Sequence, residues 1–184
     1  MALTKGVSFV NVRAFVVSRG GEPTWEQALE NLDERDRQEL VGVLAVGWYD
    51  LSLYARLIRA VDATLGTGDL TLLPALGRFE AERDLTTIHR LFLRMANPGW
   101  VVERTMEYWR RFHDTGEWRV QRDGSNTVRG TLDGWGVVDA ALCLELTGYM
   151  PRLMELSGAS HAHIDHRTCR GLGASECLFV MTWQ

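Results

Sequence analysis

The spacing of apolar residues changes from a helical to a strand period within residues 116–132, which read GEWRVQRDGSNTVRGTL. At the start of this segment Trp118, Val120 and Arg122 alternate with polar neighbours, the two-residue period of a strand with one face buried. A turn-forming run, Asp-Gly-Ser-Asn, occupies 123–126, and 127–132 continues in extended form. The segment therefore predicts a β-hairpin.

Upstream of this hairpin the apolar residues recur at helical spacing, and glycine or proline punctuates the pattern. The spacing predicts helices over 7–17, from Pro23 to Leu32, over 51–65, over 70–95 with a break near Gly77, and over 100–113. The charged run 33–40 is typical of a solvated face. Residues 1–115 should thus be mainly helical.

Downstream of the hairpin one long apolar helix is predicted over 136–156, followed by strands over 161–168 and 176–183. Strands segregated in this way favour an antiparallel sheet with helices packed on it. We therefore predict a single α+β domain over 1–184. Its helical N-terminal part would pack on an antiparallel sheet formed by C-terminal strands, with one long apolar helix between the strand pairs in 116–184.

Composition excludes some classes of partner. Of 184 residues, 20 are Lys or Arg and 24 are Asp or Glu, so the net charge is −4 and no basic stripe offers itself to nucleic acid. No run approaches the roughly 20 apolar residues of a membrane span, and the first residues lack the layout of a signal peptide. We expect a cytoplasmic protein with no nucleic-acid partner.

Three cysteines and one histidine near the C-terminus offer the number and types of ligand that a tetrahedral zinc site takes. Their spacing is Cys143-x22-His166-x2-Cys169-x7-Cys177. Cys143 lies opposite Glu145 on the predicted helix, so we expect it to face the interior. The same residues also fit a metal-free interpretation, in which the thiols are small buried hydrophobic groups and the imidazole is partly buried.

The runs CLELTGY at 143–149 and CRGLGASECLF at 169–179 resemble the 4-vinyl reductase domain of bacterial small-molecule sensors. Together with the run GEPTW at 21–25, they also resemble a related bacterial family of unknown function. The resemblance implies an α+β fold like that of trafficking-complex subunits of the TRAPP type, usually dimeric. We therefore expect a homodimer.

The 4-vinyl reductase resemblance also implies a structural zinc at positions 143, 166, 169 and 177, with His166 in place of an acidic ligand. It further implies a pocket for a small apolar or aromatic molecule. The candidate pocket residues are Trp100, Tyr108, Trp109, Trp135 and Tyr149, with His89 as a polar group. Aromatic residues at helical spacing are more often plain core, so the same residues also fit an interpretation without a ligand.

Haem-based gas sensors share a Lys-Gly, an apolar helix and a Trp with this N-terminus, but they require an axial histidine and a Tyr-x-Ser-x-Arg clamp. None of the chain's tyrosines begins such a clamp, and His89 alone remains as an axial candidate. We therefore expect no haem.

Catalytic motifs are missing, and Glu80, Glu82 and Asp84 lie beside two arginines, a pattern that favours mutual neutralisation. We predict a non-enzymatic small-molecule-binding regulatory module that signals to an unidentified protein partner. Two alternatives stay open: a dimeric adaptor or scaffold of TRAPP-like fold without a ligand, and a metal-dependent enzyme, which would need an open coordination position.

Overall fold

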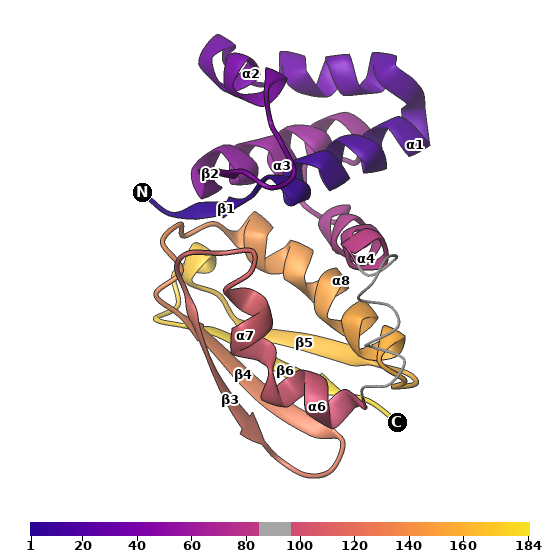
Figure 1. Ribbon diagram of the computed structural model, residues 1–184, viewed down its shortest axis with the longest axis vertical. Helices are drawn as coiled ribbons and strands as arrows, with labels where there is room; N and C mark the ends of the chain where they lie inside the picture. The colour runs from indigo at the N-terminus through magenta and orange to yellow at the C-terminus, as the bar shows by residue number, and fades with distance from the viewer. Residues whose placement is uncertain (85–96) are drawn as a thin grey trace.

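The computed structural model describes residues 1–84 and 97–184, and its helices and strands stack in layers (Figure 1). The elements are β1 (Leu3–Lys5), α1 (Gly6–Glu30), α2 (Glu34–Val41), β2 (Trp48–Asp50), α3 (Leu51–Leu65), α4 (Leu73–Asp84), α6 (Pro98–Glu103), α7 (Thr105–Trp109), β3 (Glu117–Arg122), β4 (Thr127–Asp133), α8 (Ala140–Leu156), β5 (His163–Thr168), the 3-10 turn η1 (Arg170–Leu172) and β6 (Cys177–Thr182). Helices α1 to α3 form one layer, the sheet forms another, and α4 and α8 lie between them.

Helix α1 continues through the Gly20-Gly21 pair at which the sequence predicted its end. Gly21 adopts a left-handed backbone conformation, with φ of 77°, and Pro23 follows without a backbone N–H to donate. The result is a sharp kink between two helical arms rather than a loop. Helix α3 has the bounds that its periodicity predicts.

Glycines set the distance between α4 and α8. A Cβ on Gly77 would collide with the Glu145 carbonyl oxygen, and a Cβ on Gly148 would collide with the carbonyl of Pro74. The predicted break near Gly77 is therefore wrong, because this glycine serves close helix packing in the interior of α4. The second half of the predicted 70–95 helix, including His89, lies outside the described residues.

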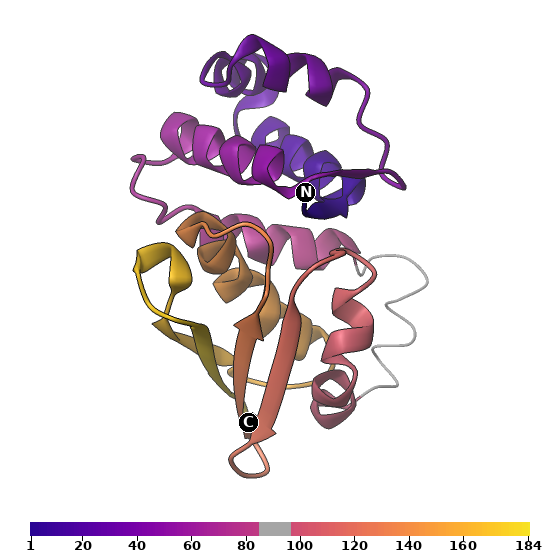
Figure 2. The same cartoon turned by 90° about the vertical axis from the view of Figure 1, so that its left-hand side faces the viewer.

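The four-stranded sheet is antiparallel, with the order β3-β4-β6-β5. Alternate residues such as Trp118, Leu132 and Phe179 are buried, whereas their neighbours along each strand are more exposed. Side chains of α6, α7 and α8 line cavities together with residues of this sheet. The turned view in Figure 2 shows the short helices α6 and α7 beside β3. The predicted α+β class, with a helical N-terminal part and a C-terminal antiparallel sheet, is confirmed.

A two-stranded ladder that the sequence did not reveal joins the helical layer to the rest. Strand β1 pairs with β2, and Thr4 forms a further bridge to His113. The Lys5 amide donates to the Phe112 carbonyl at 2.9 Å. Three-residue strands are too short for a period to show, so only tertiary pairing defines them.

Candidate ligand cavity

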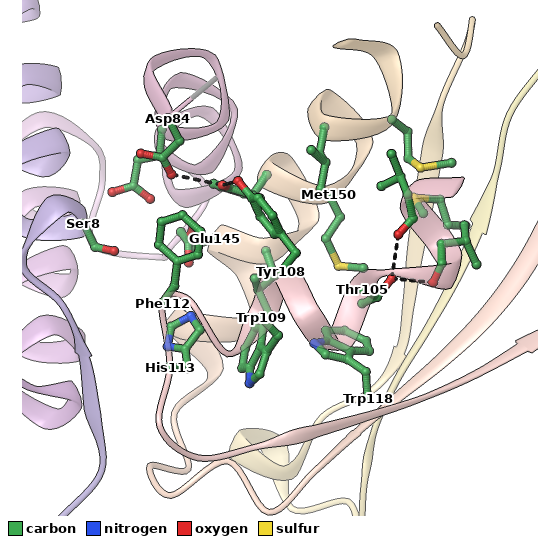
Figure 3. Close-up of a pocket in the computed structure, with 18 of the residues that line it drawn as sticks. Ser8, Asp84, Thr105, Tyr108, Trp109, Phe112, His113, Trp118, Glu145 and Met150 are labelled. Atoms are coloured by element: carbon green, nitrogen blue, oxygen red, sulfur yellow. Dashed lines mark hydrogen bonds between the residues drawn. The ribbon is translucent and has the colours of Figure 1, made fainter. Parts of the chain in front are cut away.

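A cavity opens on the buried face of the sheet, between α7 and α8 (Figure 3). It offers about 90 Å³ to water-sized molecules, room for about three waters at roughly 30 Å³ each. The lining residues are Ser8, Tyr54, Glu80, Asp84, Val101, Val102, Thr105, Tyr108, Trp109, Phe112, His113, Trp118, Glu145, Leu146, Tyr149, Met150, Leu153, Met154 and Met181. Every layer of the fold contributes to this wall.

Aromatic rings give the wall its rigidity. Trp109 meets Trp118 and Trp135 edge to face, with ring centroids 5.8 and 5.0 Å apart. Its indole N–H donates to the Thr115 carbonyl at 2.9 Å. Because both the ring and the polar edge of Trp109 are engaged, this residue is a fixed part of the cavity.

Two tyrosine hydroxyls connect α7 to α8 across the cavity. The hydroxyl oxygens of Tyr108 and Tyr149 lie 2.6 Å apart, and the Tyr149 hydroxyl donates to Asp84 Oδ2 at 3.0 Å. Asp84 Oδ1 accepts from the Asn11 amide at 2.7 Å, so the chain of hydrogen bonds reaches α1. Burial raises the pKa of both tyrosines, which therefore stay protonated.

Two buried carboxyl groups face each other where α4 packs on α8. Glu80 is 3% exposed and Glu145 is 6% exposed, and they are hydrogen-bonded to each other. The Tyr54 hydroxyl lies 3.1 Å from both carboxyl oxygens of Glu80. Burial, followed by the charge of Glu145, raises the pKa of Glu80, and burial raises the pKa of Glu145 to about 7. The pair therefore retains at least one proton at neutral pH.

The wall also contains an unpartnered imidazole nitrogen. Nδ1 of His113 is buried, and within 1–84 and 97–184 no hydrogen-bond partner reaches it. Burial lowers the pKa of His113 to about 3, so the ring is neutral. A neutral imidazole has one acceptor nitrogen, and Nδ1 accepts when the proton is on Nε2.

The predicted pocket residues divide into those that line the cavity and those that do not. Tyr108, Trp109 and Tyr149 line it. Trp135 lies one ring away, packed on Trp109, and Trp100 is 40% exposed with its ring against Arg104. His89 is outside the described residues.

Of the four predicted metal ligands, the three thiols come together and His166 does not join them. The Sγ atoms of Cys143, Cys169 and Cys177 lie within 4.8 Å of one another, and all three residues are buried. His166 is not part of that group of ligand atoms; its ring stacks on Phe179 with centroids 4.3 Å apart. Burial raises the pKa of Cys143 and of Cys169, so neither is a ready thiolate.

Sequence reasoning missed the buried carboxyl pair, although two signals were present. The buried positions of α4 are 73, 76, 77, 80 and 81, the spacing of one helix face, and this places Glu80 inward. Glu145 is the lone charge in the apolar run 140–146. Mutual neutralisation holds for Glu82, which pairs with the neighbouring Arg78 at 3.9 Å and also with Arg152 at 3.0 Å. It is wrong for Glu80, whose carboxyl group contacts the Tyr54 hydroxyl.

No family model and no curated protein match this chain, whereas several solved structures share its fold. An H-NOX protein from S. oneidensis in the Fe(II)NO state superposes with a TM-score of 0.74 at 17% identity, over 98% of this chain and 99% of that one. The SO2144 H-NOX domain from Shewanella oneidensis in the Fe(II)CO state reaches 0.73 at 20% identity, over 98% of both chains. The unliganded Fe(II) H-NOX protein from K. algicida gives 0.73 at 13% identity, over 98% and 96%.

These similarities correct the family resemblance drawn from the sequence. The chain has the H-NOX fold, so the likeness to the 4-vinyl reductase domain and to TRAPP-type subunits is wrong. The zinc expectation falls with it, because the metal in these neighbours is iron. The physical reason is that the spacing of a few cysteines does not determine the fold. Different backbones can bring the same side chains together.

The expectation of no haem is contradicted as well, because neighbours of this fold are described in Fe(II), Fe(II)NO and Fe(II)CO states, and another neighbour is described by its haem redox potential. The Tyr-x-Ser-x-Arg motif concerns only the residues that contact the cofactor. Its absence therefore does not indicate which backbone fold the chain adopts. Within the described residues, the lining is largely apolar, but the cavity offers only about 90 Å³, and its lining holds three carboxyl side chains and no Lys or Arg. This part of the lining does not fit the two carboxylates of haem.

No helix among the described residues is both long and apolar enough to cross a membrane.

Proposed function

We propose that this chain is a small-molecule-binding regulatory module whose ligand enters the cavity between α7 and α8. The observation that carries the proposal is a predominantly apolar cavity on the sheet, with a few buried polar groups at one end. Pockets of this composition are the usual binding sites of small organic molecules.

The cavity is connected to the helical layer, and this connection supports a regulatory role. Ser8 of α1 and Tyr54 of α3 line the cavity, and Thr4 is bridged to His113 in its wall. A ligand that fits one arrangement of these contacts better than another shifts the population toward that arrangement. The helical layer would then present the change to a protein partner.

Titration with indole, a neutral aromatic probe, tests the proposal. Calorimetry measures the binding, because indole has the same fluorophore as Trp109 and Trp118, which line the cavity. Wild type and the exposed-site control Leu172→Trp should bind one indole, whereas Leu153→Trp, which fills the cavity, should lose at least tenfold in affinity. Equal binding by the filled variant, or no saturable binding to wild type, would contradict the proposal.

The fold neighbours favour a second candidate function, haem-based sensing of small gases. Adding haemin to the purified protein and recording the absorbance spectrum tests it. One haem per chain, with a Soret band that moves when CO is added to the reduced protein, would support this candidate. A spectrum that remains that of free haemin would reject it.

A further inference from the structure

The cavity has two chemically different ends. In Figure 3, Ser8, Asp84 and Glu145 lie on the side of α1 and α4, whereas Met150 and Trp118 lie toward the sheet. Apolar residues of α6 and β6 continue the second end. A ligand that satisfies both ends therefore has a polar group at one extremity and an apolar skeleton behind it.

The polar end is rich in acceptors. Glu80 and Glu145 are more than nine-tenths buried, and the lining of the cavity within the described segments contains no Lys or Arg. Burial disfavours the charged form of both carboxyl groups, so this pair retains a proton. A cation of the ligand would replace that proton.

His113 supplies an independent indication of the ligand's polarity. Its buried Nδ1 lacks a partner within 1–84 and 97–184 and lines the same cavity. Because the ring is neutral, it has a free acceptor to offer and carries no charge that would repel a cation. A ligand with several N–H donors satisfies both the imidazole and the carboxyl pair.

We infer that the ligand is a small organic cation, a protonated primary amine on an aromatic or aliphatic skeleton. Its ammonium group lies against the Glu80–Glu145 pair, and its skeleton extends toward Trp118. An ammonium has three donors and no acceptor, which matches this end of the cavity. The inference rests on the proposed function, since it names the ligand class of the same cavity.

Three probes of similar size and different charge test the inference by calorimetry: 2-phenylethylamine, 2-phenylethanol and phenylacetate. The amine should bind at least tenfold more tightly than the alcohol, and phenylacetate should bind more weakly than the alcohol. Phenylacetate binding as tightly as the amine would overturn the inference and leave the proposed function standing if indole still binds. Failure of all three probes and of indole would overturn both.

Amide variants identify the carboxyl groups responsible. Glu145→Gln and Glu80→Gln keep the side-chain volume and remove the charge, so each should weaken the amine at least tenfold and change the alcohol less than threefold. Glu82→Gln is the matched control, because Glu82 lies on α4 and outside the cavity lining. Amine affinity unchanged in both cavity variants would overturn the inference; the wild-type probe series decides the case if a variant fails to fold.

Discussion

The hydroxyl groups of Tyr108 and Tyr149 meet at 2.6 Å although the two residues are 41 positions apart in the chain. Because Tyr149 donates its proton to Asp84, the proton between the two tyrosines comes from Tyr108. One polar chain thus holds α7, α8 and α4 around the cavity.

Tyr149→Phe should lower the free energy of unfolding by about 1–3 kcal/mol, because Asp84 loses a donor and Tyr108 loses its acceptor in a buried site. Tyr108→Phe should cost less, since the Tyr149 to Asp84 hydrogen bond survives. Urea unfolding followed by circular dichroism measures both values. A Tyr149→Phe protein as stable as wild type would show that these hydrogen bonds contribute nothing to stability.

Gly77→Ala and Gly148→Ala should each destabilise the protein by about 1–3 kcal/mol or more, because the added methyl collides with backbone and separates α4 from α8. The control is Gly42→Ala, where nothing lies within 4 Å of the added carbon. Thermal unfolding distinguishes the three. Equal stability of the Gly77 variant and the Gly42 control would contradict the packing argument.

Stability should respond to the Glu80–Glu145 pair in a defined direction of pH. The pKa of Glu145 is about 7 in the folded protein against an ordinary value of 4.5, so the folded state binds more protons in this window. The contribution of Glu145 to stability is therefore complete below about pH 4.5 and falls by at most about 1.4 kcal/mol per pH unit up to about pH 7.

His113 acts in the opposite direction. Its folded pKa of about 3 lies below 6.5, so its contribution is present above about pH 6.5 and is lost as the pH falls toward 3. The difference between wild type and Glu145→Gln isolates the carboxyl effect. Urea midpoints measured between about pH 5 and pH 8 should change less steeply with pH for Glu145→Gln than for the control Glu82→Gln. Parallel curves for the two variants would show that protonation of Glu145 does not affect stability.

The three thiols should react slowly with a disulfide reagent in the folded protein, because all are buried and burial raises the pKa of Cys143 and Cys169. The same reagent should titrate three thiols at once in guanidinium chloride. Rapid labelling of any thiol without denaturant would show that the cluster opens readily.

Local pattern accounts for much of the secondary structure. The hairpin at 116–132, the long apolar helix and the two final strands follow from periods of two and 3.6 and from their turn residues. Part of the thiol cluster also follows from local geometry, since Cys143 lies opposite Glu145 on its helix and Cys177 alternates with more exposed positions on its strand. The presence of Cys169 in the cluster, in place of His166, does not follow from it.

The ligand cavity could not be obtained in this way. Glu145 lies near Cys143 on the same helix, and the sequence placed it on the polar side, yet both are buried. Helix α8 is covered on one side by α4 and on another by the sheet, so no single stripe defines its interior. His113 and Tyr54 reach the same cavity only because Thr4 of β1 bridges to His113 and α3 packs against α8.

What the sequence determined by itself is therefore the class of fold and the inward faces of its regular elements, because these depend on near neighbours along the chain. Which fold family the chain adopts, and which buried groups share one cavity, depended on tertiary contacts. Such contacts join residues tens of positions apart. They change the environment, the pKa and the role of a side chain such as Glu80, and the neighbouring residues in the sequence do not indicate this change.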